Sequence, residues 1–366
     1  MRILITGGGT GGHIYPALAM ARYVRDAQPG ASILFVGAEG GMEEKIVPAA
    51  GFPLETLPVK GFSRKKITGA FHTVYLLGGA CVRAKRTIEG FKPDVVFGTG
   101  GYASAPTIIA ALTERKKVII HEQNIVPGMT NRFLAPWVDK VCLSFDASKP
   151  YYWKKRNLVV TGNPRASEMN QLQKGTARHL LKMHKDIPLL LVSSGSRGAA
   201  RINQCMVEFL EHTRNCTKIQ VLYITGEVYY DEIISRLKRN RVFDKFGENL
   251  QVRPYQQEMP VAMAAADMMI SRAGATTLAE ITSLGVPTIL IPSPNVVNDH
   301  QLKNARSLAE VNAAVLLEEK VLTAQTLKEQ IDDLIDQPLK RKELGINSRK
   351  LGKPKAAEMI YELIAF

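Results

Sequence analysis

Short apolar runs rich in β-branched residues alternate with longer amphipathic segments along the whole chain. This alternation predicts β-α units that feed parallel sheets, so the expected fold class is α/β. The strands predicted in the first half are Arg2–Thr6, Ser32–Gly37, Asp94–Gly98, Lys117–His121 and Lys140–Ser144. Those predicted in the second half are Pro188–Ser193, Ile219–Ile224, Leu250–Arg253, Met268–Ser271 and Thr288–Ile291.

The same pattern predicts two doubly wound domains. A chain of 366 residues exceeds the roughly 250–300 residues at which single cores stop growing. The best boundary is Gly162-Asn163-Pro164, where a strand-like run at 158–160 ends in turn residues. We therefore expect domains over residues 1–163 and 164–353, with Lys353-Pro354 as a candidate second crossing.

Composition narrows the functional classes. With 45% hydrophobic residues the chain can bury a large core, which excludes a mainly disordered protein. Four scattered cysteines without a Cys-x-x-Cys pair favour neither a disulfide framework nor a thiolate zinc site. No apolar run reaches the ~18 residues of a membrane span, and no signal peptide is recognisable. We expect a protein made and kept in the cytosol.

The net charge of +14 lies mainly in residues 1–165 and predicts an anionic partner, although a solubilising surface is the alternative. No aromatic-studded basic groove or reader motif points to nucleic acid. Apolar and basic residues mix between positions 60 and 92, as expected for docking on anionic lipid or, alternatively, for a helix packed on its own domain. They are Lys60, Phe62, Arg64, Lys65, Lys66, Ile67, Phe71, Val74, Leu76, Leu77, Arg83, Lys85, Arg86 and Lys92.

A glycine-rich loop, Gly7-Gly8-Gly9-Thr10-Gly11-Gly12-His13, follows the first strand, and Pro16 is expected to open the next helix. Such a loop brings backbone N–H groups close to an anion. Its spacing also fits a dinucleotide cofactor, but Glu39 lies too far along the chain to bind the ribose. His13 is a candidate general base, and a hydrogen bond to a neighbouring loop is the alternative role.

Two further loops of the first half carry polar residues. They are Gly98–Pro106, with the sequence GTGGYASAP, and His121–Asn124, with the sequence HEQN. Both follow predicted strands, where ligands of parallel sheets bind, so we expect them to line an acceptor site. Helix capping and turn formation by Ser104 and Asn124 is the structural alternative.

The second half contains two comparable helix starts. Gly195–Asn203 resembles an anion cradle, but no Gly-Lys-Ser/Thr follows, which disfavours simple ATPase chemistry. At 271–280, small residues and two threonines open a helix, and Glu280 shares a face with Thr276 and Thr277. We expect Glu280 to accept ribose hydroxyls, unless it serves only as a charge near the helix start. Gln301 and Asn304 are candidates for sugar contacts.

Six motifs together resemble the MurG family of peptidoglycan glycosyltransferases over essentially the whole chain. They are GGGTGGH at 7–13, GTGGYASAP at 98–106, HEQN at 121–124, GNPR at 162–165, GSRGA at 195–199 and SRAGATTLAE at 271–280. The resemblance implies a GT-B fold, two Rossmann-like doubly wound domains with an interdomain cleft. It also implies that the N-terminal domain binds the acceptor and docks on the membrane, and that the last helix, 354–366, packs against this domain. Residues 164–353 are implied to bind the UDP-sugar.

Site residues follow from the same resemblance. It implies His13 as the catalytic base. The substrate-binding positions that it implies are Thr10, Gly11, Gly12, Asn124, Arg165, Ser196, Gln256, Ala275, Thr276, Thr277, Leu278, Ala279, Glu280 and Gln301. Three details depart from the family pattern: Arg165 directly follows Gly-Asn-Pro, Gln256 stands where relatives have isoleucine, and His300 adjoins Gln301.

The implied reaction transfers N-acetylglucosamine from UDP-N-acetylglucosamine to lipid I, giving lipid II with inversion at the anomeric carbon. The implied place is the cytoplasmic face of the cell membrane, with cell-wall synthesis proteins as further partners. No Asp-x-Asp motif occurs, so neither a donor-bound metal nor a cofactor is expected. The alternatives are another GT-B lipid glycosyltransferase, such as one acting on diacylglycerol, and an epimerase of UDP-N-acetylglucosamine.

Overall fold

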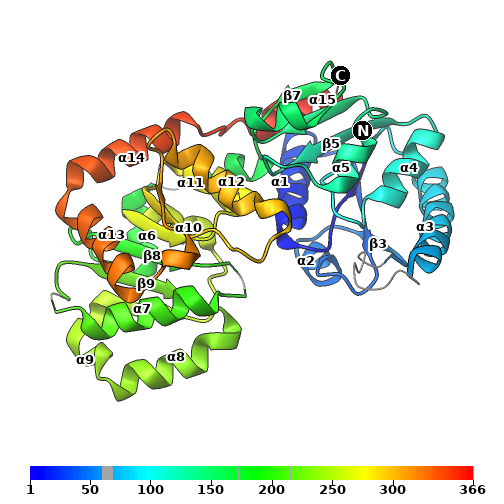
Figure 1. Cartoon of the computed structure of the whole chain (residues 1–366). Coiled ribbons are helices and arrows are strands. Elements are labelled where there is room, and N and C mark those ends of the chain that lie inside the picture. The colour runs from blue at the N-terminus through cyan, green and yellow to red at the C-terminus, as the bar shows by residue number, and fades with distance from the viewer. Residues whose placement is uncertain (60–68, 172, 196, 215, 366) are drawn as a thin grey trace. The chain divides into compact units, whose positions relative to one another are not determined.

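The computed structural model describes residues 1–59, 69–171, 173–195, 197–214 and 216–365, leaving out the side chains of 69–77, 170, 171 and 297. Contacts divide the chain into two compact units. The first unit contains Met1–Glu168 and Lys353–Phe366, and the second contains Met169–Gly352. Each unit is a parallel sheet with helices on both faces (Figure 1).

The sheet of the first unit has the strand order β3-β2-β1-β4-β5-β6-β7. Its strands are β1 (Arg2–Thr6), β2 (Ser32–Ala38), β3 (Leu54–Leu57), β4 (Val95–Gly98), β5 (Lys117–Glu122), β6 (Lys140–Leu143) and β7 (Leu158–Val160). The helices are α1 (Gly11–Ala27), α2 (Glu43–Ala49), α3 (Gly69–Phe91), α4 (Ala105–Thr113), α5 (Met129–Leu134) and α15 (Ala356–Ala365), with 3-10 turns η1 (Asp146–Tyr151) and η2 (Pro164–Gln171).

The strand side chains of this unit alternate between two buried cores. Ile3, Ile5 and Phe97 face one core, which α1 and α15 cover, whereas Leu4 and Val96 face the other, which α3 and α4 cover. Because both faces are buried, the strands are apolar almost throughout, as is typical of parallel sheets. Figure 1 shows α3 and α4 side by side on one flank of the sheet and α1 on the other.

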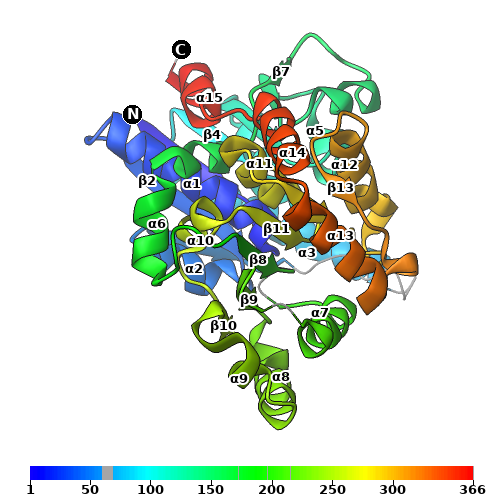
Figure 2. The ribbon, with the colours of Figure 1, turned by 90° about the vertical axis from the view of Figure 1, so that its left-hand side faces the viewer.

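The second unit repeats this plan with the strand order β10-β9-β8-β11-β12-β13. Its strands are β8 (Leu189–Ser193), β9 (Gln220–Ile224), β10 (Leu250–Arg253), β11 (Met268–Ser271), β12 (Thr288–Leu290) and β13 (Val315–Leu316). Its helices are α6 (Lys174–Leu181), α7 (Ala200–His212), α8 (Glu227–Arg239), α9 (Val242–Phe246), α10 (Met259–Ala265), α11 (Ala275–Leu284), α12 (His300–Ala309), α13 (Ala324–Asp336) and α14 (Pro338–Lys350), with 3-10 turns η3 (Gly247–Asn249), η4 (Val297–Asp299) and η5 (Glu319–Val321). In Figure 2, α7 packs with α13 and α6 with α10 around the sheet.

All ten predicted strands are confirmed to within one residue at either end. The prediction missed β3 and β13, which are short and border the sheets, and so carry little apolar signal. The prediction that Pro16 opens a helix was wrong. The carbonyl of Thr10 already accepts the N–H groups of His13 and Ile14, so α1 begins at Gly11 and contains Pro16 in its interior.

Residues 164–168 pack with the first unit, whereas the sequence placed them in the second domain. Two contacts hold them there. Arg22 pairs with Glu168 at 2.9 Å, and the hydroxyl of Ser167 accepts the N–H of Ala357 at 3.0 Å. These contacts attach residues 164–168 to α1 and α15 of the first unit. The turn residues Gly162-Asn163-Pro164, from which the domain boundary was predicted, do not reveal contacts with such distant residues.

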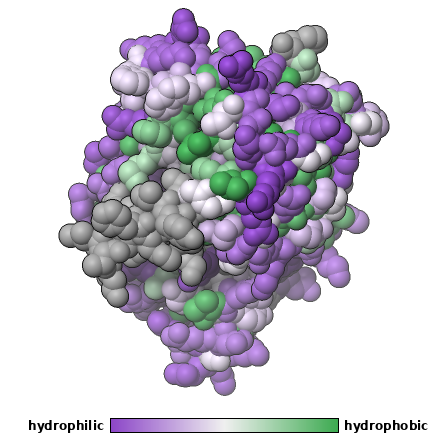
Figure 3. Space-filling view, turned by 90° about the vertical axis from the view of Figure 1, so that its right-hand side faces the viewer, coloured by the Kyte–Doolittle hydropathy of each residue, from purple (hydrophilic) through white to green (hydrophobic). Residues whose placement is uncertain are grey.

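None of the described helices combines the length and the apolar character needed to cross a bilayer. The face in Figure 3 is largely hydrophilic, with smaller apolar groups among the polar ones. This mixture is usual for a protein exterior, which also exposes apolar atoms.

Helix α15 fills one core of the first unit, so its truncation tests the packing. Replacing the fully buried Ile360 with alanine leaves a cavity and should lower the free energy of unfolding of this unit by about 2–5 kcal/mol. Ile346→Ala in α14, where the side chain is 48% exposed, is the matched control. Hydrogen exchange of the β1 and α1 amides measures the effect. Faster exchange in β8 instead would contradict this packing.

Candidate functional site

Each sheet reverses its strand order at one point, and ligands of open parallel sheets bind there, beyond the carboxyl ends of the strands. In the first unit the reversal lies between β1 and β4, and in the second between β8 and β11. Four of the six motifs follow these four strands, and the other two, HEQN and GNPR, lie at the ends of β5 and β7. We call the loops after β1, β4 and β5 the histidine site, and the loops after β8, β10, β11 and β12 the α11 site.

A buried carboxylate organises the glycine-rich loop of the histidine site. Glu43 is fully buried, and its two oxygens accept the N–H groups of Gly9 and Ala38 at 3.1 and 2.9 Å. A Cβ at Gly8 would lie 2.0 Å from this carboxylate, and one at Gly37 would lie 2.5 Å from the same side chain. The N–H of Gly9 is therefore committed to a protein anion, so this part of the loop is not the phosphate cradle that the glycines suggest.

His13 is held by the loop that follows β4. Its Nδ1 lies 2.9 Å from the carbonyl oxygen of Thr99, while the hydroxyl of Thr99 donates to the carbonyl of His13 at 2.9 Å. A carbonyl oxygen only accepts, so Nδ1 of the neutral ring carries the proton and Nε2 carries the lone pair. The ring is half-buried. Its orientation comes from a backbone carbonyl and requires no acidic partner, and it suits a general base.

The HEQN motif supports the orientation of His13 through buried hydrogen bonds. Gln123 donates from Nε2 to the same carbonyl of Thr99 at 2.8 Å, and its Nε2 lies 3.1 Å from Nδ1 of His121. Nε2 of His121 lies 3.0 Å from the carbonyl oxygen of Gly162. Burial lowers the pKa of His121 to about 4, so this ring is neutral near pH 7. Gln123 and His121 fix the carbonyl that orients His13.

Glu122 of the same motif is a buried hub. Its carboxylate accepts the backbone N–H groups of Asn124 and Gly128 at 3.0 and 3.1 Å and the side-chain amide of Asn131 at 2.9 Å. The prediction that this motif lines an acceptor wall is therefore wrong for Glu122 and Gln123, which are at most 2% exposed. Asn124 alone is half-buried, and its carbonyl accepts the hydroxyl of Ser148.

Arg165 also belongs to the first unit. Its guanidinium lies 5.7 Å from the ring centre of Tyr15 in α1 and pairs with Glu168, and its backbone N–H donates to the side chain of Asn163 at 3.0 Å. Tyr15 lies in the first turns of α1, which also contain Gly11, Gly12 and His13, and Thr10 is the N-cap of this helix. The structure thus brings Arg165 to the helix that begins at the histidine site.

In the second unit, the loops after β8 and β9 interlock. Gly198 has a φ of +71°, and a Cβ there would lie 2.1 Å from the carbonyl oxygen of Thr225. Asn203 of α7 donates to the same carbonyl at 2.9 Å and accepts the hydroxyl of Tyr223 at 3.0 Å. The start of α7 is held rigidly by these contacts. Ser196, expected at this turn, lies outside the described residues.

The run from Ala275 to Glu280 forms the first turns of α11, directly after Gly274. The first N–H groups of a helix have no partners within it, and they favour an anion. Thr276, Thr277 and Ala279 are half-buried, whereas the side chain of Leu278 is fully buried in the core. Leu278 can therefore meet a ligand only through its backbone. Glu280, one turn inside the helix, is 7% exposed as a residue.

Arg272 braces the start of α11. Its Nη1 donates to the carbonyl oxygens of Ile291 and Pro292 at 3.1 and 3.2 Å and pairs with Glu319 at 2.5 Å. These bonds join the loop after β11 to the loop after β12. Sequence reasoning treated Arg272 only as part of a motif, although it fixes the geometry of the helix start.

Other side chains that were predicted to contact the UDP-sugar make hydrogen bonds within the protein. Gln256 accepts from Arg253 at 2.6 Å, and the side chain of Gln301 accepts the N–H of Ser293 at 2.9 Å. Asn304 is fully buried and donates to the carbonyl of Ala273 at 3.3 Å, so the prediction that its side chain contacts a sugar was wrong. Asn304 instead positions the turn that leads into α11.

Sequence reasoning missed Glu43 as a part of the site. It expected the loops of Thr99 and Gln123 to line an acceptor site, whereas these two residues orient His13. A signal for Glu43 existed, because Gly8, Gly37 and Gly41 leave room for one large side chain, but only the fold shows which one fills it. Among the described residues, no three His, Cys, Asp or Glu side chains gather as they would around a metal ion.

Two family models match the chain. The glycosyltransferase family 28 N-terminal domain matches residues 3–143, and the glycosyltransferase family 28 C-terminal domain matches residues 189–360. The chain is 44% identical over 364 residues to the UDP-N-acetylglucosamine–N-acetylmuramyl-(pentapeptide) pyrophosphoryl-undecaprenol N-acetylglucosamine transferase of Caldanaerobacter subterraneus subsp. tengcongensis, covering 100% of this chain and 99% of the relative. The enzyme of the same name from Bacillus cytotoxicus is 45% identical over 368 residues, covering 100% and 98%.

Solved structures agree with the sequence comparisons. MurG of Acinetobacter baumannii superposes with a TM-score of 0.76 at 25% identity, covering 100% of this chain and 99% of that one. The UDP-GlcNAc 2-epimerase of Neisseria meningitidis, solved with UDP-GlcNAc bound, has a TM-score of 0.69 at 13% identity with complete coverage of both chains. The latter likeness shows a shared GT-B-type fold and does not favour the epimerase alternative. With full-length relatives above 40% identity and both domain models matched, the chain belongs to the MurG family of N-acetylglucosaminyltransferases, within glycosyltransferase family 28.

Proposed function

We propose that this chain transfers N-acetylglucosamine from UDP-N-acetylglucosamine to the 4-hydroxyl of the muramoyl sugar of lipid I, with inversion at the anomeric carbon. The product is lipid II, the disaccharide precursor of peptidoglycan. The observation that carries the proposal is His13, oriented as a base at the strand-order reversal of a chain whose full-length relatives bear this transferase name.

On the acceptor side, Nε2 of His13 accepts the proton of the muramoyl 4-hydroxyl as the oxygen attacks the anomeric carbon. The bond from that carbon to the UDP oxygen breaks, and its electron pair leaves with UDP. One such in-line displacement converts an α-linked donor into a β-1,4 product, by the same geometric logic as inverting glycoside hydrolysis. The carbonyl of Thr99 stabilises the imidazolium that forms, because it accepts a hydrogen bond from the Nδ1–H group.

On the donor side, the start of α11 binds the diphosphate, whose negative charge grows as UDP departs. Backbone N–H groups and the hydroxyls of Thr276 and Thr277 are suited to hold phosphate oxygens. Glu280 lies one turn further along α11 and accepts the ribose hydroxyls. Gln256 contributes its backbone, since its side chain already bonds to Arg253.

The acceptor carries an undecaprenyl chain, so we propose that the enzyme works at the cytoplasmic face of the cell membrane, where other cell-wall synthesis proteins act. The docking residues expected from the sequence between 60 and 77 lie outside the described side chains. In the described remainder of that segment, Arg83 pairs with Glu39 at 2.9 Å and Lys85 with Glu114 at 2.7 Å. Both side chains therefore form ion pairs with carboxylates of this chain.

Transfer of radiolabelled N-acetylglucosamine from UDP-N-acetylglucosamine to a short-chain lipid I analogue tests the function, and it should persist with chelator. In this assay His13→Ala should lower kcat about 10²–10⁴-fold, the usual contribution of a general base, with unchanged UDP affinity. His212→Ala, on the exposed surface of α7, is the control and should leave kcat unchanged. Undiminished turnover of H13A would assign the base to another group.

Glu43→Gln tests the support of the glycine-rich loop. One oxygen of the carboxylate becomes an NH₂ group, which cannot accept the N–H of Gly9 or Ala38, so a buried donor loses its partner. We expect kcat to fall at least about tenfold, with UDP affinity intact. The neighbouring exposed residue gives the control Glu44→Gln. If E43Q transfers sugar as fast as E44Q, the loop does not depend on this carboxylate.

Glu280→Ala should weaken UDP about 10- to 100-fold, since a hydrogen bond to a charged group contributes about 1.5–3 kcal/mol and 1.4 kcal/mol is tenfold. The parent should bind 2′-deoxy-UDP more weakly than UDP, whereas E280A should bind both alike. Calorimetry of the two ligands measures this difference. A variant that still distinguishes them would remove Glu280 from the ribose site.

A further inference from the structure

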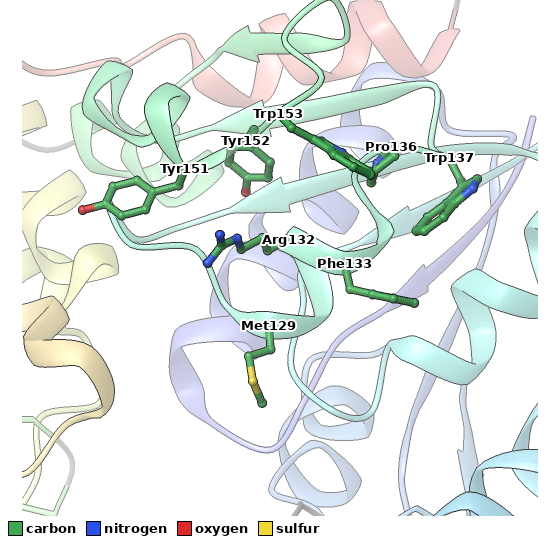
Figure 4. A pocket seen from close by; sticks show the side chains of 8 residues that line it. All are labelled: Met129, Arg132, Phe133, Pro136, Trp137, Tyr151, Tyr152 and Trp153. Carbon is green, nitrogen blue, oxygen red and sulfur yellow. The ribbon is translucent and has the colours of Figure 1, made fainter.

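An aromatic cluster lies on the first unit, formed by residues outside the six motifs that define the family. It consists of Phe133, Trp137, Tyr151, Tyr152 and Trp153, from α5, the turn after it, η1 and the residues following η1 (Figure 4). Together with Met129, these side chains line an open pocket of about 430 Å³. The rings of Phe133 and Trp137 lie 5.3 Å apart.

Four large apolar side chains of the cluster are exposed. Trp153 is 81% exposed, Met129 69%, Phe133 67% and Trp137 56%, and the chain has no other tryptophan. Contiguous exposed apolar patches of this kind mark surfaces that meet another molecule or a membrane. Helix α5, which carries Met129 and Phe133, is packed into the unit on its opposite side, where Asn131 and Leu134 are buried.

Basic residues accompany the cluster. Arg132 lines the pocket and is exposed, Lys154 donates to the carbonyl of Pro136, which also lines the pocket, and the exposed Lys155 and Arg156 follow in the sequence. Tryptophan and tyrosine concentrate at membrane interfaces because their rings are apolar and their N–H and O–H groups remain hydrated. Cations beside such rings add attraction to anionic headgroups of about 1 kcal/mol each.

We propose that the aromatic cluster is a surface by which this protein docks on an anionic lipid bilayer. Trp137 and Trp153 enter the headgroup region, Phe133 and Met129 reach the acyl boundary, and Arg132, Lys155 and Arg156 contact the phosphates. This surface is separate from the segment between 60 and 92 that the sequence singles out.

The cluster is connected to the histidine site by hydrogen bonds. Asn131 of α5 donates to the carbonyl of His121 and to Glu122, and Ser148 of η1 donates to the carbonyl of Asn124. The elements α5 and η1 follow β5 and β6. Strand β5 pairs with β4, and β6 pairs with β5, all in parallel, so α5 and η1 lie at the same carboxyl edge of the sheet as the loop that follows β4. Docking through the cluster therefore holds this edge at the lipid surface, and this consequence rests on the proposed function.

Intrinsic fluorescence tests the docking directly, because both tryptophans lie in the cluster. Vesicles of phosphatidylglycerol and phosphatidylcholine should shift the emission to shorter wavelength, and brominated acyl chains should quench it. Vesicles of phosphatidylcholine alone should act much more weakly. Single-tryptophan variants Trp137→Phe and Trp153→Phe assign the signal to each ring. Unaltered emission from protein that sediments with the anionic vesicles would overturn the proposal.

The variant Phe133→Ser with Trp137→Ser should lower partitioning onto anionic vesicles at least about tenfold. Val228→Ser with Leu339→Ser, at exposed positions of the second unit, is the control and should partition like the parent. Equal partitioning of both variants, or a lipid-free emission shift that grows with protein concentration, would overturn the proposal. Transfer to the short-chain acceptor should survive in both variants. Its absence in the parent would refute the proposed function and leave the docking measurement valid.

Discussion

The parallel pairing of β1 with β4 is the constraint on which the histidine site depends. Thr6 lies opposite Gly98 in this pairing, so the loops that follow the two strands leave the sheet side by side. A Cβ on Gly101 would lie 2.5 Å from the carbonyl oxygen of Gly8, which shows how closely the loops approach. This proximity allows the carbonyl of Thr99 to reach the imidazole of His13 and select its tautomer.

Buried polar groups maintain that geometry. Removing them from water costs free energy, and hydrogen bonds within the protein offset this desolvation cost. Glu43 and Glu122 are carboxylates inside the first unit, and each is surrounded by backbone N–H groups or amide donors. An unsatisfied buried charge costs several kcal/mol, so each carboxylate confines its donors to narrow positions. The loops that carry chemistry are thereby rigid without regular secondary structure of their own.

The two units apply the same topology to different chemistry. At the strand-order reversal of the first unit, a buried carboxylate occupies the glycine loop and the proposed reactive group is His13, a base. At that of the second unit, α11 begins with small residues and threonines, and Arg272 secures the preceding loop by bonding to the carbonyls after β12. The first arrangement suits a neutral hydroxyl acceptor, whereas the second suits an anionic leaving group. A surface rich in exposed aromatic rings lies at the same sheet edge as His13.

The sequence by itself determined the α/β class, ten of the strands and the motif-bearing loops, because apolar periodicity and glycine positions are local properties. It also determined the family, through six ordered motifs. Only the tertiary structure decided that the side chains of His121, Glu122 and Gln123 support the site from within, that Glu43 fills the glycine loop, and that residues 164–168 pack with α1 and α15. Those outcomes depend on which distant residues meet, and hydrogen-bond partners separated by dozens of positions leave no periodic signal in the chain.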